Sequence, residues 1–64
     1  MSNKKDKTIT ILGEKLDQKY FPKLYGWAKS NPATLENTLQ SLANQPGGSI
    51  TNAMISLESD LQHG

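Results

Sequence analysis

The side chains best suited to recognition chemistry lie together in residues 15–27. Lysines recur there at every fourth position, and all four aromatic residues of the chain lie among or just after them. Ammonium groups attract carboxylates and phosphates, and aromatic rings supply large contact surfaces for a partner. This combination predicts a partner-binding surface made of Lys15, Lys19, Lys23, Tyr20, Phe21, Tyr25 and Trp27.

The aromatic residues have two interpretations. Each large ring can bury about 150–250 Å², so in a short chain all four would be the main material of the core. Two adjacent rings beside a proline cannot both point inward, however, and this leaves at least one of Phe21, Tyr25 and Trp27 exposed as an anchor for a partner. The three lysines likewise form either a binding stripe or an ordinary solvated face.

Catalytic and metal chemistry find no support in the sequence. The chain has no cysteine, and its one histidine, His63, lies beside the C-terminus with no nucleophile at a suitable spacing. The six acidic residues are scattered, and no glycine-rich loop of a phosphate-binding type is present. We therefore expect a protein without enzyme activity, catalytic residues, a metal site or a cofactor.

Charge is divided between the two halves of the chain. All seven basic residues are lysines within residues 1–29, where three acidic residues leave a net charge of +4, whereas residues 30–64 carry −3. Such a division can orient a partner even though the total is only +1. Arginine, the commonest reader of guanine and phosphate, is absent. The distribution favours an acidic protein surface as the partner.

Length limits the stability of the chain and thus its class. A domain of 64 residues buries only about 60% of the surface that its unfolded form exposes, so a partner or self-association commonly supports it. The apolar run at 9–12 is far too short for a secretion signal or a membrane span. We expect a cytoplasmic protein without membrane contact, and self-association into a homodimer is left open.

The elements that must position these residues begin with a mobile arm at 1–7, followed by a single small domain at 8–64. Alternation at 8–12 predicts a short strand or extended arm with Ile9 and Ile11 on one face. Such a strand must pair within the chain or with another chain. Apolar spacing after Gly13 predicts a helix over about 14–29, kinked or broken at Pro22.

The second half predicts an antiparallel helical hairpin. A helix over about 32–44 starts with Asn31 as its cap and Pro32 at its first position, and the residues "QPGG" at 45–48 end it. Ser49 or Thr51 then caps a helix over about 50–62. Apolar stripes on both helices require cover, which the 14–29 segment can provide. The predicted fold class is mainly α.

Two segments resemble the ribbon-helix-helix family of small dimeric repressors. "KTITILGEKLDQ" is similar to that family's strand and first helix, and "GGSITNAMISLESDL" is similar to its second helix. The resemblance implies a two-stranded ribbon, formed by a dimer, that reads the major groove, with a helix N-terminus holding a backbone phosphate. The nucleic-acid-binding residues would then be Lys5, Lys7, Thr8, Thr10 and Ser49.

The leading hypothesis is a small non-enzymatic regulatory or inhibitor-like protein. It acts by contact with a larger protein, through the aromatic residues and lysines of its first half. The alternative is a dimeric nucleic-acid-binding protein that uses the 8–12 strand and the N-terminal lysines.

Overall fold

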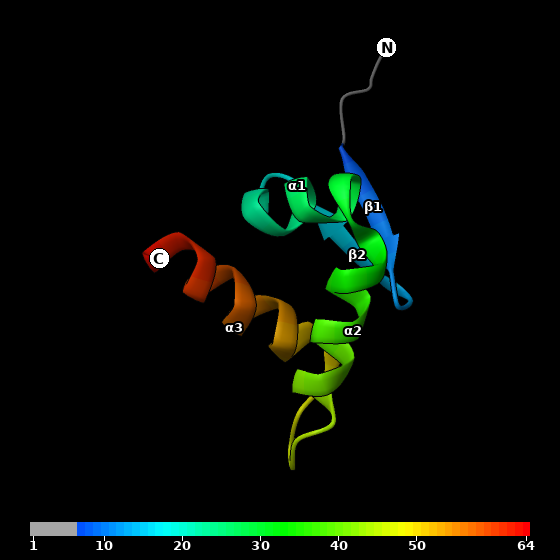
Figure 1. Cartoon of the computed structure of the whole chain (residues 1–64), viewed down its shortest axis with the longest axis vertical. Helices are drawn as coiled ribbons and strands as arrows, with labels where there is room; N and C mark the ends of the chain where they lie inside the picture. Colours follow the sequence, from blue (N-terminus) through cyan, green and yellow to red (C-terminus); the bar gives the residue numbers. More distant parts are fainter. Residues whose placement is uncertain (1–6) are drawn as a thin grey trace.

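The computed structural model describes residues 7–64, which form three helices and a two-stranded antiparallel sheet (Figure 1). Most of the predicted N-terminal arm, including Lys5, lies outside the described residues. The mainly-α fold is confirmed, and so is the helical hairpin in the second half. In chain order the elements are β1 (Thr8–Ile11), β2 (Glu14–Asp17), α1 (Pro22–Ser30), α2 (Pro32–Ala43) and α3 (Ile50–His63).

The first two elements form a β-hairpin closed by a two-residue turn. Leu12 and Gly13 have φ angles of 50° and 80°, and positive φ at both central positions is the mark of a type I′ turn. This turn pairs Ile9 with Leu16 and Ile11 with Glu14. Its backbone twist matches that of the two strands, so the chain folds back on itself without distorting them.

The predicted helix over 14–29 is wrong in its first half, because residues 14–17 form β2. Leu16 and Leu24 are both fully buried, but they reach the core from a strand and from a helix. Their spacing of eight residues imitates a helical repeat without being one. Pro22 neither kinks nor breaks a helix; it occupies the first position of α1, where the missing N–H costs no hydrogen bond.

The starts of α2 and α3 differ in how they are capped. Asn31 alone separates α1 from α2, and it occupies the N-cap of α2 without forming a side-chain cap bond. The predicted cap at Asn31 is therefore correct in position only. Ser49 caps α3, since its side-chain oxygen accepts a hydrogen bond from the Asn52 amide at 3.1 Å. This resolves the choice between Ser49 and Thr51.

The core lies where the hairpin and the three helices meet. Helices α2 and α3 lie together near their connecting loop and diverge towards α1, while both strands of the hairpin contact α1 (Figure 1). Every element contributes buried apolar side chains, and no single pair of elements could cover them. These side chains are Ile11, Leu16, Leu24, Ala28, Leu35, Leu39, Ala53 and Met54.

Two glycines predict opposite effects of alanine on stability. A Cβ added at Gly48, in the α2–α3 loop, would lie 2.8 Å from the Ala43 carbonyl oxygen, whereas one added at Gly26, within α1, meets nothing within 4 Å. Gly48→Ala should lower the free energy of unfolding by about 1–3 kcal/mol because backbone must shift. Gly26→Ala should raise it by about 0.5–1 kcal/mol through helix propensity. Urea unfolding of both variants measures this, and equal effects would contradict the loop geometry.

Candidate functional site

A tight turn between β2 and α1 presents Tyr20 to solvent. The side-chain oxygen of Asp17 accepts a hydrogen bond from the Lys19 amide at 2.8 Å, and its carbonyl accepts from the amides of Tyr20 and Phe21 at 3.1 and 2.8 Å. These bonds reverse the chain after the strand. Tyr20 then projects outward with 66% of its surface exposed, while Phe21 turns back onto the core. The turn therefore fixes where the exposed ring lies.

Two lysines lie over tyrosine rings in this part of the molecule. The Lys19 ammonium is 5.7 Å from the centre of the Tyr20 ring, and the Lys29 ammonium is 5.6 Å from the centre of the Tyr25 ring. Both distances are within the range for attraction between a cation and an aromatic face. Such contacts restrict flexible lysine side chains, so less entropy is lost when the charge meets a partner.

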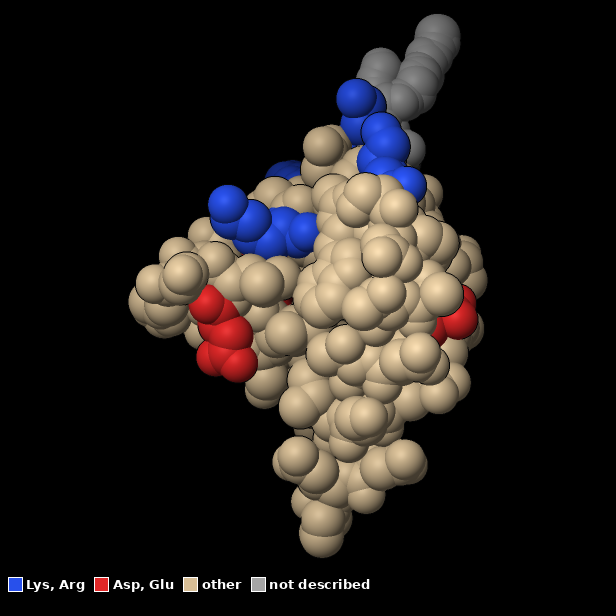
Figure 2. Space-filling model, viewed as in Figure 1, with Lys and Arg blue, Asp and Glu red and all other residues tan. Residues whose placement is uncertain are grey.

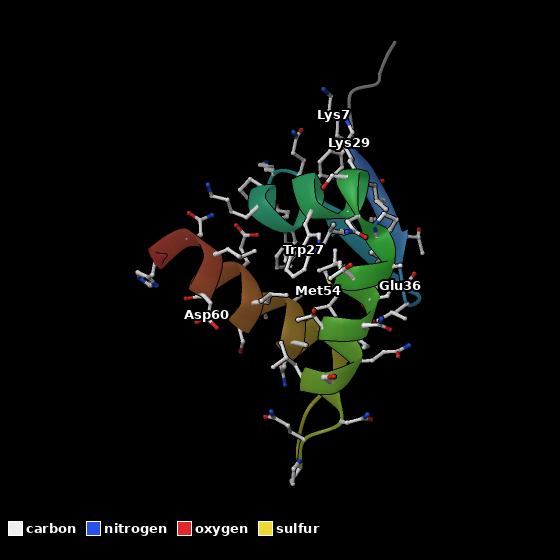
Figure 3. All side chains as sticks on the ribbon, viewed as in Figure 1. Lys7, Trp27, Lys29, Glu36, Met54 and Asp60 are labelled. Carbon is white, nitrogen blue, oxygen red and sulfur yellow. The ribbon has the colours of Figure 1, made fainter. Side chains whose placement is uncertain are left out.

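The other three aromatic residues belong to the edge of the core. Phe21, Tyr25 and Trp27 are half-buried and pack against the buried cluster. Figure 3 shows the Trp27 ring extending from α1 into the space between the helices, towards Met54. The expectation that one of these three would be the exposed anchor is therefore wrong. Tyr20 is the exposed aromatic residue, because the turn directs it away from the core.

The three evenly spaced lysines do not form a helical stripe, which corrects the expectation from their spacing. Lys15 lies in β2, Lys19 in the turn and Lys23 in α1, and all three are exposed. Lysines instead gather over α1 and the start of β1, while acidic side chains lie elsewhere on the visible face (Figure 2). We call this region the basic end; its exposed lysines are Lys7, Lys19, Lys23 and Lys29.

A buried carboxylate from α3 holds α1 in place. Glu58 is 6% exposed, and its two carboxylate oxygens accept hydrogen bonds from the amides of Lys23 and Leu24 at 3.3 and 3.0 Å. These amides belong to the first turn of α1, where no carbonyl within the helix is available to them. Gln62, one turn further along α3, donates to the same carboxylate. Neither Phe21 nor any acidic residue of the first turn caps this helix, so Glu58 supplies the cap.

The residues predicted for a nucleic-acid interface do not form one surface. Thr8 and Thr10 are exposed on β1 and Lys7 precedes them, but Ser49 caps α3 beside the loop at the opposite end of the molecule (Figure 1). Strand β1 pairs with β2 of the same chain. The segment similar to a first repressor helix is thus a strand, and this corrects the ribbon-helix-helix resemblance.

Comparison of the chain with protein-family models, with curated proteins and with solved structures finds no match. Residues 7–64 contain no group of three or more His, Asp or Glu side chains arranged to hold a metal ion. Within the same residues, no helix has the length and apolar character needed to cross a membrane.

Removal of the Glu58 carboxylate should destabilise the fold. Glu58→Ala leaves two first-turn amides without acceptors, one buried and one partly buried, and we expect the free energy of unfolding to fall by about 2–4 kcal/mol. Glu58→Gln keeps one acceptor oxygen and should cost about half as much. Asp60→Ala, on the same helix but exposed, is the matched control and should change stability by less than about 0.5 kcal/mol. Equal effects at positions 58 and 60 would contradict the cap.

Alanine substitutions should separate the exposed ring from the packed rings. Tyr20→Ala should change the free energy of unfolding by less than about 0.5 kcal/mol, since that ring is mostly in solvent. Phe21→Ala and Trp27→Ala should each lower it by about 1–3 kcal/mol, because both rings pack on the core. Thermal unfolding followed by circular dichroism measures the difference. A Tyr20→Ala variant as unstable as Trp27→Ala would refute the assignment of Tyr20 to the surface.

Proposed function

We propose that this protein is a small non-enzymatic regulatory or inhibitor-like binding protein that contacts a larger protein through its basic end. The observation that supports this most strongly is the exposed Tyr20 ring with the Lys19 ammonium 5.7 Å from its centre. Tyrosine is among the residues that dominate binding energy when a partner covers them. With 66% of its surface exposed, the Tyr20 ring leaves a large contact area that a partner can cover.

The charge around the ring indicates the partner's chemistry. Lys19, Lys23 and Lys29 are exposed on the turn and on α1, whereas Glu58 on the neighbouring helix is buried and bonded to backbone amides. The region therefore presents three exposed lysines, and the half-buried Asp17 carboxylate, which accepts from the Lys19 amide, offsets only part of their charge. Such a surface attracts a carboxylate-rich face and increases its rate of association. We propose a larger, acidic protein as the partner, encountered in the cytoplasm, which the absence of cysteine allows.

The half-buried aromatic residues support the contact without forming its centre. Phe21 and Trp27 pack on the core and keep α1 fixed beneath the surface, while Tyr25 lies under the Lys29 ammonium. The contribution of Lys15 is peripheral, because it extends from the hairpin opposite Thr10. The proposed contact residues are accordingly Tyr20 and Lys19, flanked by Lys23 and Lys29.

Site-specific photo-crosslinking tests this proposal. A photoreactive phenylalanine analogue replaces Tyr20 in one variant and Ile55 in the other; both positions are exposed, and Ile55 lies on α3. In the cells that make the protein, we expect a discrete protein adduct from position 20 and none from position 55. Adding Lys19→Glu and Lys23→Glu should abolish the adduct, since both changes reverse the attracting charge.

Two results would contradict the proposal. The first is the same set of adducts from both positions, which reports only accessibility. The second is no protein adduct at position 20 together with binding of a generic DNA duplex that weakens steeply as salt rises. That salt dependence is the signature of lysine contacts with phosphates, and it would favour the nucleic-acid-binding alternative.

A further inference from the structure

The outer edge of β1 presents hydrogen-bonding groups that the hairpin does not use. The Gln18 amide donates to the Lys7 carbonyl at 2.9 Å, which makes Lys7, Ile9 and Ile11 the residues whose backbone groups face β2. The amides and carbonyls of Thr8 and Thr10 therefore point away from β2. Within residues 7–64, no hydrogen bond to these groups is formed. Both threonines are exposed, so the edge is accessible.

The two edges of the sheet differ in how well they are protected. Strand β2 carries the charged residues Glu14, Lys15 and Asp17, and the turn that follows occupies the Asp17 carbonyl. Charges and covering segments are the usual means by which proteins prevent an edge from pairing. Strand β1 has the sequence TITI, with no charge, proline or bulge. The unprotected edge is thus the one formed by threonine and isoleucine, which favour strands.

The residues that flank β1 in the hairpin, Lys7 and Glu14, are opposite in sign, although Asp17 on β2 lies opposite Thr8 at the lysine end. Lys7 precedes the strand, and Figure 3 shows Lys29 gathered with it at this end. At the other end lies Glu14, which directly follows the turn, and Glu36 on α2 is also placed towards that end in the view of Figure 3. A second strand running antiparallel to β1 and carrying the same charges would place its acidic end beside the lysines. A second copy of this chain meets that requirement.

We propose that β1 pairs antiparallel with β1 of a second copy, forming a continuous four-stranded sheet with a two-fold axis at Ile9. In this register Thr8 of each copy lies opposite Thr10 of the other, and each such pair exchanges both of its backbone hydrogen bonds. The two Ile9 residues face each other as the closer, non-hydrogen-bonded pair. Each half-buried Ile9 side chain then gains an apolar neighbour.

The pairing is expected to be weak and salt-dependent. A strand of four residues buries much less than the roughly 1,200–2,000 Å² of a stable interface, so association belongs in the micromolar to millimolar range. The attraction between Lys7 and Lys29 of one copy and the acidic residues of the other is exposed, and salt screens it. This inference does not rest on the proposed function, because the pairing strand β1 contains none of the proposed contact residues, of which only Lys29 also takes part here.

Sedimentation equilibrium of paired charge variants tests the pairing and its direction. Thr8→Lys combined with Thr10→Glu places opposite charges across the antiparallel dimer and should tighten association about tenfold. Thr8→Lys combined with Thr10→Lys places like charges there and should weaken association about tenfold. Both positions are exposed, so circular dichroism should show the same fold in each variant. Thr10→Pro, which removes an outward amide, should give a monomer at every concentration.

Three outcomes would overturn the proposal. The first is a wild-type chain that remains a monomer up to millimolar concentration. The second is equal association of the two charge variants. The third is a folded Thr10→Pro variant that dimerises like the wild type. Should proline unfold the hairpin, the comparison of the charge variants still decides, because neither changes the backbone.

Discussion

One polar interaction fixes the start of α1: the buried carboxylate of Glu58 accepts hydrogen bonds from two backbone amides of its first turn. Helix α1 has only nine residues, which is too short for stability in isolation, and its first turn has no cap of its own. A negative charge at this end also interacts favourably with the positive end of the helix dipole. Burial strengthens both effects because water no longer competes for the amides. The constraint therefore joins the last helix to the segment that bears the exposed tyrosine.

This arrangement separates the residues that hold the fold from those available for binding. Phe21 and Trp27 pack against the core, and Tyr20 projects outward from the turn just before α1. A binding surface on a rigid element loses less entropy on association than one on a free loop. The unused edge of β1 is a second and separate surface. The exposed Tyr20 turn and the β1 edge are thus two separate surfaces on which the proposed contacts can form.

Local signals in the sequence predict the helical half of the molecule well. Pro32 and Ser49 mark helix starts, and the glycines at 47–48 mark a loop, because each restricts the backbone within a few residues. The hairpin is less accessible to such reasoning. Its turn places Leu12 at a positive φ, a conformation that leucine rarely adopts and that the sequence does not announce. Leu16 and Leu24 then match a helical spacing although a strand and a helix carry them.

The candidate site, too, is predicted only in part by the sequence. Its lysines and aromatic residues are visible in the sequence, but which ring is exposed depends on the turn after Asp17. Glu58 accepts hydrogen bonds from amides of α1 that lie 35 and 34 positions earlier in the chain. No local sequence pattern predicts a contact of that kind. An acidic residue within an amphipathic helix is expected to be exposed unless the packing of another element is known. Tertiary structure therefore decides which aromatic ring is exposed and whether Glu58 is buried, two points that the sequence leaves open.

Amide hydrogen exchange of the wild-type protein, measured by NMR, tests the role of Glu58 most directly. Leu24 and Thr34 occupy the same position in the first turns of α1 and α2. The Leu24 amide donates to the Glu58 carboxylate, whereas the N-cap side chain of α2, Asn31, forms no cap bond. The Leu24 amide should exchange about tenfold or more slowly than the Thr34 amide, after correction for intrinsic rates. Equal exchange at these two amides would show that Glu58 does not hold α1, and would contradict the account.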